Sequence, residues 1–122
     1  MSKFVEVKTA ELVGPALDWA VAQIEGQKYI VKHITKTSLN LAGQVIAVEH
    51  QANYRPSADW AQGGPLWDEW ATSMEHYDGW LVAVVGGDAQ GHTKLIALCR
   101  AIVAAKLGDL VQVPVELVRA GS

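Results

Sequence analysis

One apolar segment decides the fold: residues 93–108, with the sequence TKLIALCRAIVAAKLG. Its large apolar side chains recur on most of the circumference of a helix, a pattern typical of a helix that is packed on several sides. Thr93 is a favoured N-cap residue and Gly108 a favoured residue after the last turn. We therefore predict a core helix from Lys94 to Leu107, with the rest of the chain arranged around it.

Composition sets the size and class of the protein. With 122 residues, of which 50% are hydrophobic and 19% charged, we expect one globular domain over residues 1–122. Cys99 is the only cysteine, so no intrachain disulfide can form. The net charge of -3 and the lack of a Lys/Arg run argue against duplex nucleic acid as a partner. No apolar stretch approaches the roughly 20 residues that span a bilayer, so we expect a soluble protein of the cytoplasm.

A second helix and several strands are predicted around the core helix. Residues 15–25 have apolar side chains at helical spacing, Pro15 in the first turn and Gly26 after the last. Strand-forming residues occupy the runs 4–7, 28–35, 44–50, 80–85 and 110–113. Because helices and strands do not alternate strictly, we predict an α+β fold with a small antiparallel sheet of 3–5 strands packed on the core helix.

The runs 28–35 and 44–50 are predicted to form a hairpin around a polar loop at 36–43. The register that we expect makes two pairs: His33 with Ile46 and Tyr29 with His50.

Residues 57–74 are predicted to contain two short helical turns. Ser57 is a favoured N-cap for the first turn, which Gly63 and Gly64 should end. Pro65 is well suited to open the second turn.

Residues 54–70 combine three of the five tryptophans with turn-forming and polar residues. In one interpretation, the indoles fill a small core and the glycines only turn the chain. In the other, this segment lines a binding site, where aromatic rings stack on a flat ligand and polar groups orient it. The candidate ligand-binding residues are Tyr54, Arg55, Ser57, Asp59, Trp60, Gln62, Gly63 and Gly64. The residues alone leave both interpretations open.

A glycine-rich loop is expected between the strand at 80–85 and the core helix, and it resembles a phosphate-binding P-loop. Gly86, Gly91 and Thr93 have the right spacing, but His92 replaces the lysine that contacts the phosphates. Asp88 adds a charge that repels phosphate. We therefore reject an NTPase and keep His92 and Thr93 as additional candidates, because free amides at a helix start can bind an anion.

No catalytic, metal or cofactor site is predicted. The four histidines lack metal-ligand spacing, and Cys99 lies among apolar residues of the core helix, where a thiol behaves as a small hydrophobe. Ser57 has no nucleophile-elbow motif around it. The simplest enzymatic alternative is a hydrolase that uses Asp59 with His92 as general acid, although no spacing requires it.

Three segments resemble the NinX-like family of small phage and prophage proteins. They are ELVGPALDWAVA at 11–22, YRPSADWAQGGP at 54–65, and RAIVAAKLGD at 100–109 followed by Val113-Pro114. The resemblance implies a phage accessory protein of unassigned biochemical function in the host cytoplasm. It also favours the central segment as a site, which Asp18 and Trp19 of the first block are expected to approach.

Two functions follow as hypotheses. The first is a non-catalytic binder that sequesters a small nucleotide-like ligand, for example in counter-defence. The alternative is a protein-interaction module that acts on a host protein or on a second copy of itself, because exposed aromatic residues are frequent interface anchors. A homodimer is the expected assembly, since two-fold symmetry is the most common one.

Overall fold

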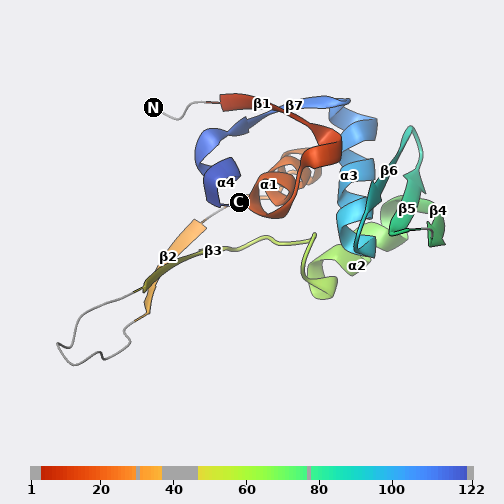
Figure 1. The fold of residues 1–122 in the computed structure, drawn as a ribbon. Coiled ribbons are helices and arrows are strands. Elements are labelled where there is room, and N and C mark those ends of the chain that lie inside the picture. The colour runs from red at the N-terminus through yellow and green to blue at the C-terminus, as the bar shows by residue number, and fades with distance from the viewer. Residues whose placement is uncertain (1–3, 30, 37–46, 77, 121–122) are drawn as a thin grey trace.

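The computed structural model describes residues 4–29, 31–36, 47–76 and 78–120, which form the α+β fold that the sequence predicts. Figure 1 shows one helix, α3, with several elements packed on it, and one hairpin that extends away from the rest of the chain. In chain order they are β1 (Phe4–Lys8), the 3-10 helix η1 (Thr9–Glu11), α1 (Gly14–Glu25), β2 (Val31–Lys36), β3 (Ala47–Ala52), α2 (Trp60–Trp70), β4 (Ala71–His76), β5 (Trp80–Val84), β6 (Gly87–Gly91), α3 (Lys94–Leu107), β7 (Leu110–Pro114) and α4 (Val115–Ala120).

Helix α3 is the centre of the core, as predicted. Thr93 caps it by accepting a hydrogen bond from the Ile96 amide at 3.1 Å, and the chain leaves the helix at Gly108 with φ 91°. Its buried residues are Leu95, Ala97, Leu98, Cys99, Ala101, Ile102 and Val103. They cover more than one side of the helix, so neighbouring elements must pack on it from several directions.

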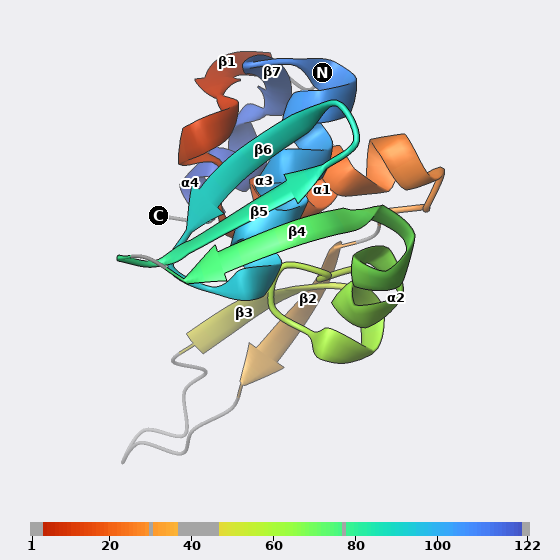
Figure 2. The same cartoon turned by 90° about the vertical axis from the view of Figure 1, so that its right-hand side faces the viewer.

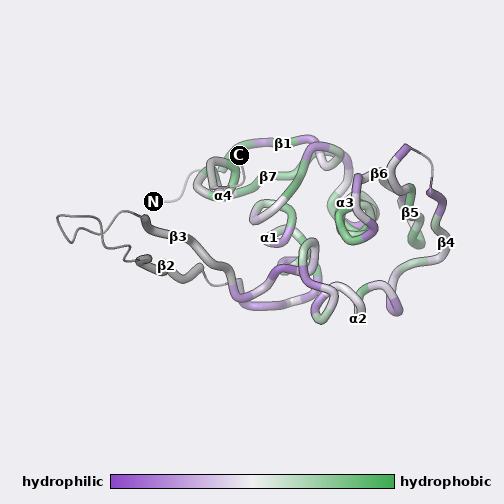
Figure 3. Tube along the Cα trace, turned by 60° about the horizontal axis from the view of Figure 1, so that its bottom comes forward, coloured by the Kyte–Doolittle hydropathy of each residue, from purple (hydrophilic) through white to green (hydrophobic). Residues whose placement is uncertain are grey.

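The strands are antiparallel and form three small sheets, whose orders are β1-β7, β2-β3 and β4-β5-β6. The three-stranded sheet lies against one side of α3, and α1 packs on another side (Figures 1 and 2). Figure 3 shows that β5, β7 and much of α3 are hydrophobic, whereas the chain that leads into α2 is hydrophilic. The core therefore lies between the sheet, α1 and β7.

Strand β6 occupies most of the segment 86–92, for which the sequence predicted a glycine-rich loop, so that prediction was wrong. Its glycines permit close packing on α3: a Cβ atom would lie 3.0 Å from the Ala105 nitrogen at Gly87, and 2.7 Å from the Ala97 nitrogen at Gly91. Because real Cβ atoms rarely approach backbone so closely, glycine is required at Gly91 for the sheet to reach the helix. Packing thus explains Gly87 and Gly91, whereas Gly86 takes a positive φ of 96° in the turn before β6.

Helix α1 confirms the predicted second helix. Pro15 lies in its first turn, and Gly26 ends it in the left-handed conformation with φ 69°. The helix packs against α3 and also against α4, which the sequence analysis did not predict. Among the described helices, none has the length and apolar composition needed to cross a bilayer.

Helix α2 corrects the prediction of two short turns within 57–74. One helix continues through Gly63, Gly64 and Pro65 and ends at Trp70, after which the chain forms β4. Glycine and proline inside a helix cost roughly 1 and 3 kcal/mol, respectively, relative to alanine. Packing offsets this cost: Leu66 is buried in the core, and the Gly63 position lies against α3.

The β2–β3 hairpin exists, but its register differs from the prediction. His33 pairs with His50, four residues beyond the expected partner Ile46, which lies outside the described residues. A shift by an even number of residues keeps every side chain on the same face of the ribbon. The alternation of side chains therefore cannot distinguish the two registers. The loop expected at 36–43 lies almost entirely outside the described residues.

The two adjacent glycines of α2 provide a matched test of this packing. A Cβ atom at Gly63 would overlap the Pro56 carbonyl oxygen and lie 2.6 Å from Leu95 Cδ2, whereas at Gly64 it would meet no atom within 4 Å. We expect Gly63→Ala to lower the free energy of unfolding by roughly 1–3 kcal/mol through overpacking. Gly64→Ala should raise it by up to about 1 kcal/mol, because alanine is the better helix former. Urea denaturation measures both; equal effects of the two variants would contradict the close approach of α2 to α3.

Candidate functional site

A groove of about 440 Å³ lies where the start of α2 meets the starts of β5 and α3. We call it the Trp60 groove; its lining residues are Ser57, Ala58, Trp60, Trp80, His92, Thr93, Lys94 and Leu95. None of these residues is acidic. The groove therefore combines aromatic surfaces with polar groups and one lysine, and it has no carboxylate that would repel an anion.

Two indoles give the groove flat apolar surfaces. Trp60 is 55% exposed, and its ring centroid lies 6.2 Å from that of Trp67. Trp80 is half-buried and is 4.4 Å from the ring of His76, and the Lys94 ammonium lies 4.6 Å from its centroid. An exposed indole and an indole bearing a cation are surfaces that an aromatic ligand can contact.

The beginning of α3 contributes positive potential. The first-turn amides of a helix have no intrahelical acceptor, and the helix dipole places partial positive charge there. The side chain of Thr93 occupies the Ile96 amide, and the first turn contains no acidic residue. Together with Lys94, this end of the groove favours a negatively charged group.

The chain before α2 is held in a rigid turn by its own polar groups. Asp59 accepts a hydrogen bond from the Ala61 amide at 2.9 Å and thereby caps α2. The Gln62 side chain accepts from the Arg55 amide and donates to the Asn53 carbonyl at 3.1 Å. These hydrogen bonds shape the wall of the groove, so Asp59 and Gln62 act on it through the backbone.

A buried carboxylate ties this turn to α1. Asp18 is 3% exposed, and its Oδ1 accepts a hydrogen bond from the amide of Ser57 at 2.9 Å. Burial raises the pKa of Asp18 from 3.8 to about 6, while hydrogen bonds from Ser57 and the charge of Arg55 oppose the shift. Since Ser57 lines the groove, its hydrogen bond to Asp18 holds this part of the groove against α1.

The structure brings some of the predicted site residues together and separates others. Ser57, Trp60, His92 and Thr93 line the Trp60 groove. Tyr54 packs against the core, where burial raises its pKa to about 12, and Arg55 is exposed. Trp19 is directed elsewhere, with its ring 6.1 Å from that of Phe4. Gly63 contributes helix packing, and Gly64 faces open space.

Sequence reasoning did not identify Trp80, Lys94, Leu95 and Ala58 as groove residues. Trp80 begins a strand and Lys94 begins a helix, so each resembles an ordinary core or surface position in its own segment. The only signal in the sequence was that Trp80 and Lys94 lie at the start of an element, and that Lys94 directly follows the candidate residues His92 and Thr93.

The described part of the chain was compared with the requirements of a reactive thiol, an acid–base pair and a metal site. Burial raises the pKa of the Cys99 thiol well above its ordinary value, which suppresses the reactive thiolate. His92 lines the groove, whereas Asp59 is engaged as a helix cap and does not line it. Among the described residues, no group of three His, Cys, Asp or Glu side chains is placed to hold a metal ion.

The raised pKa of Asp18 predicts a pH-dependent stability. The folded protein holds the Asp18 proton more tightly than the unfolded chain, so stability falls as pH rises from about 4 through 6 and then levels off. At about 1.4 kcal/mol per pKa unit, the full effect is on the order of 3 kcal/mol. Asp18→Asn, which retains an oxygen acceptor for Ser57, should therefore gain stability relative to the natural protein between pH 4 and pH 7.5. Urea denaturation at both pH values measures this; a difference independent of pH would show that Asp18 is not a desolvated carboxylate.

The Tyr29 hydroxyl is buried and has no hydrogen-bond partner among the described residues. Burial, assisted by the negative charge of Asp18, raises its pKa to about 12. Because an unsatisfied buried hydroxyl costs roughly 1–3 kcal/mol, we expect Tyr29→Phe to stabilise the protein by about 1 kcal/mol. Thermal denaturation at neutral pH measures the change, and a loss of stability would contradict an unpaired hydroxyl.

Comparison with known proteins agrees with the resemblance found in the sequence. A family model described as Bacteriophage P22, NinX matches residues 8–106, which include α1, α2, α3 except its last residue, and every residue of the Trp60 groove. A search of curated proteins gave no match. Since the family match spans most of the chain, this protein belongs to the NinX family of phage proteins.

Proposed function

We propose that the protein is a non-catalytic binder of a small nucleotide-like ligand and that the Trp60 groove is its binding site. One observation supports the proposal most directly. The half-exposed indole of Trp60 lines the same acid-free groove as Trp80, Lys94 and the positive end of α3. A nucleotide combines a flat aromatic base with a negatively charged phosphate, which are the two groups that this groove favours.

The base of the ligand is assigned to the indoles. Stacking on an aromatic side chain contributes roughly 1–3 kcal/mol per base and depends little on which base is present. Trp60 is 55% exposed, and its ring packs against that of Trp67, which restricts the indole before a ligand arrives. This preorganisation lowers the entropic cost of binding.

The phosphate is assigned to the other end of the groove. Lys94 provides a full positive charge, and the amides of the first turn of α3 provide donors without an intrahelical acceptor. Thr93 and His92 add further polar groups beside them. The ammonium of Lys94 can move from Trp80 to a phosphate, because the cation–π contact between these two half-buried residues is worth only about 1–2 kcal/mol.

Binding without turnover suits a phage protein that removes a host nucleotide or nucleotide signal from solution. The groove holds no pair of groups arranged as nucleophile and base, and the Asp59–His92 pair is not assembled in it. Sequestration requires only affinity and sufficient protein, so the ligand should be recovered chemically intact.

A protein-interaction module is the second candidate function, and the edge strand β4 favours it. Every residue from Thr72 to His76 is exposed, and β4 is an outer strand of its sheet. Such an edge can pair with a strand of another protein, and Trp60 would be a suitable aromatic anchor nearby in the chain. The partner would be a host protein or a second copy of this chain.

Two aromatic residues with equal exposure provide a controlled test of the groove. Trp60 and Phe4 are each 55% exposed, and only Trp60 lines the groove. We expect calorimetry against a panel of mononucleotides, nucleoside diphosphates and cyclic nucleotides to show binding. Trp60→Ala should weaken it at least tenfold, or about 1.4 kcal/mol, and Phe4→Ala should leave it unchanged. The ligand should be recovered intact by chromatography.

The two lysines that lie over tryptophans provide the matching test for charge. Lys94 lies over Trp80 in the groove, and Lys106 lies over Trp70 outside it. Lys94→Gln should weaken nucleotide binding and reduce its dependence on salt, whereas Lys106→Gln should not. If no nucleotide binds, the proposal fails; a host protein captured by the natural chain and lost in Trp60→Ala would then support the interaction module.

A further inference from the structure

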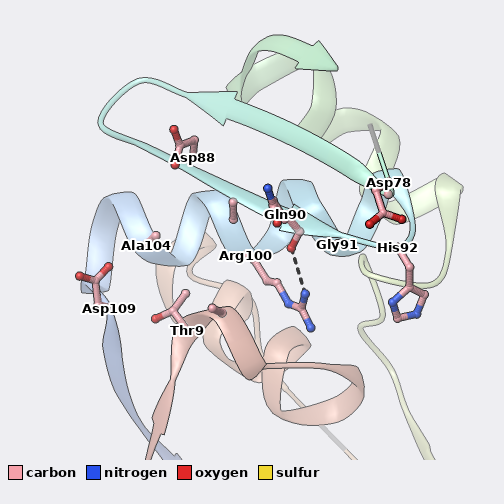
Figure 4. Close-up of a pocket in the computed structure, with 12 residues that line it drawn as sticks. Thr9, Asp78, Asp88, Gln90, Gly91, His92, Arg100, Ala104 and Asp109 are labelled. Atoms are coloured by element: carbon pink, nitrogen blue, oxygen red, sulfur yellow. Dashed lines mark hydrogen bonds between the residues drawn. The ribbon is translucent and has the colours of Figure 1, made fainter. Parts of the chain in front are cut away.

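A second cavity, also about 440 Å³, lies on the other side of His92 and runs along α3 and β6. We call it the Arg100 cavity; its polar lining includes Asp78, Asp88, Gln90, His92, Arg100 and Asp109. Figure 4 shows Arg100 between Asp109 and Thr9 at one end and Asp78 and His92 at the other. His92 lines both this cavity and the Trp60 groove, so the two are neighbours on the surface.

Arg100 is fixed in the middle of the cavity by backbone acceptors. Its Nε donates to the Leu12 carbonyl at 2.8 Å, and its Nη1 donates to the Gln90 carbonyl at 2.9 Å (Figure 4). Burial lowers its pKa, but a guanidinium remains charged at neutral pH. Arg100 forms no ion pair with a described carboxylate, so the cavity presents a positive charge and several negative charges that do not neutralise one another in direct contact.

This combination restricts the chemistry of an occupant. A phosphate would be repelled by Asp78, Asp88 and Asp109. An ammonium group would be attracted by these carboxylates, but beside Arg100, which occupies the centre, it would be repelled by the guanidinium. A hydroxyl group is neutral, donates one hydrogen bond and accepts two, so it can bond to carboxylates and a guanidinium together. A sugar carries several such hydroxyls on a small ring.

We propose that the Arg100 cavity binds the sugar group of the same ligand whose base and phosphates occupy the Trp60 groove. The ligand is then a nucleotide sugar, in which a second sugar follows the diphosphate and passes His92 into the cavity. This inference rests on the proposed function, because it assigns the base and the phosphates to the groove. The inference adds that a nucleoside diphosphate alone occupies the Trp60 groove and leaves the Arg100 cavity empty.

The test compares ligands that differ only in this sugar. Calorimetry with ADP against ADP-ribose, and with UDP against UDP-glucose, measures the gain that the sugar contributes. In at least one pair we expect the sugar-bearing ligand to bind at least tenfold more tightly than its parent diphosphate. Trp60→Ala should weaken both members of that pair by a similar factor, since both use the groove.

Two conservative variants locate the gain in the cavity. Asp78 has φ 46°, a conformation that asparagine tolerates well, so Asp78→Asn changes the carboxylate with little strain on the backbone. In Asp78→Asn and Asp88→Asn the advantage of the sugar should fall severalfold, while binding of the parent diphosphate is retained. Glu6→Gln, on exposed β1 outside both cavities, controls for the change in net charge.

The outcomes separate this inference from the proposed function. Equal binding of diphosphates and nucleotide sugars would overturn the sugar site and leave the Trp60 groove intact as a nucleotide site. A sugar advantage that survives both aspartate variants would also overturn it. If no member of either pair binds, the inference fails together with the nucleotide proposal.

Discussion

The structure depends on the burial of α3 from several sides. A helix whose apolar residues occupy most of its surface must be covered by other elements, and each of them has to approach its backbone closely. Glycines permit this at two contacts: Gly91 lets β6 lie against Ala97, and Gly63 lets α2 lie against Leu95. The positions of the sheet and of α2 are therefore consequences of covering one helix.

The Trp60 groove arises from the same constraint. Strands β5 and β6 cover one side of α3, and the turn before α2 lies near the first residues of α3. Three segments that are distant in sequence therefore meet at the start of this helix. The buried hydrogen bond between Asp18 and Ser57 then holds that turn against α1. A desolvated carboxylate is costly to bury, and here its oxygen satisfies a backbone amide that would otherwise be unpaired in the interior.

The elements governed by local rules were predictable from the sequence. The N-cap Thr93, the stop at Gly108 and the left-handed Gly26 define α3 and the end of α1 with signals that lie within a few residues. The failures share one cause. Gly63, Gly91 and Pro65 indicate a turn when their neighbours in the chain are considered alone. Tertiary packing on α3 decides the first two, and burial of Leu66 offsets the cost of the third. The hairpin register failed because side-chain alternation repeats every two residues.

Four of the eight residues that line the Trp60 groove were predictable, and they lie in two short segments of the sequence. Ser57 and Trp60 stood out because aromatic and turn residues are concentrated around them, and His92 and Thr93 because of the glycine spacing before them. The glycines before His92 have a different role from the one that drew attention to this segment. Gly91 reflects close packing of β6 on the helix, yet the same packing places His92 between an acid-free groove and a cavity with three aspartates. That difference in charge across one residue favours anionic groups on one side and neutral hydroxyl groups on the other, so a ligand that uses both sides can bind in only one direction.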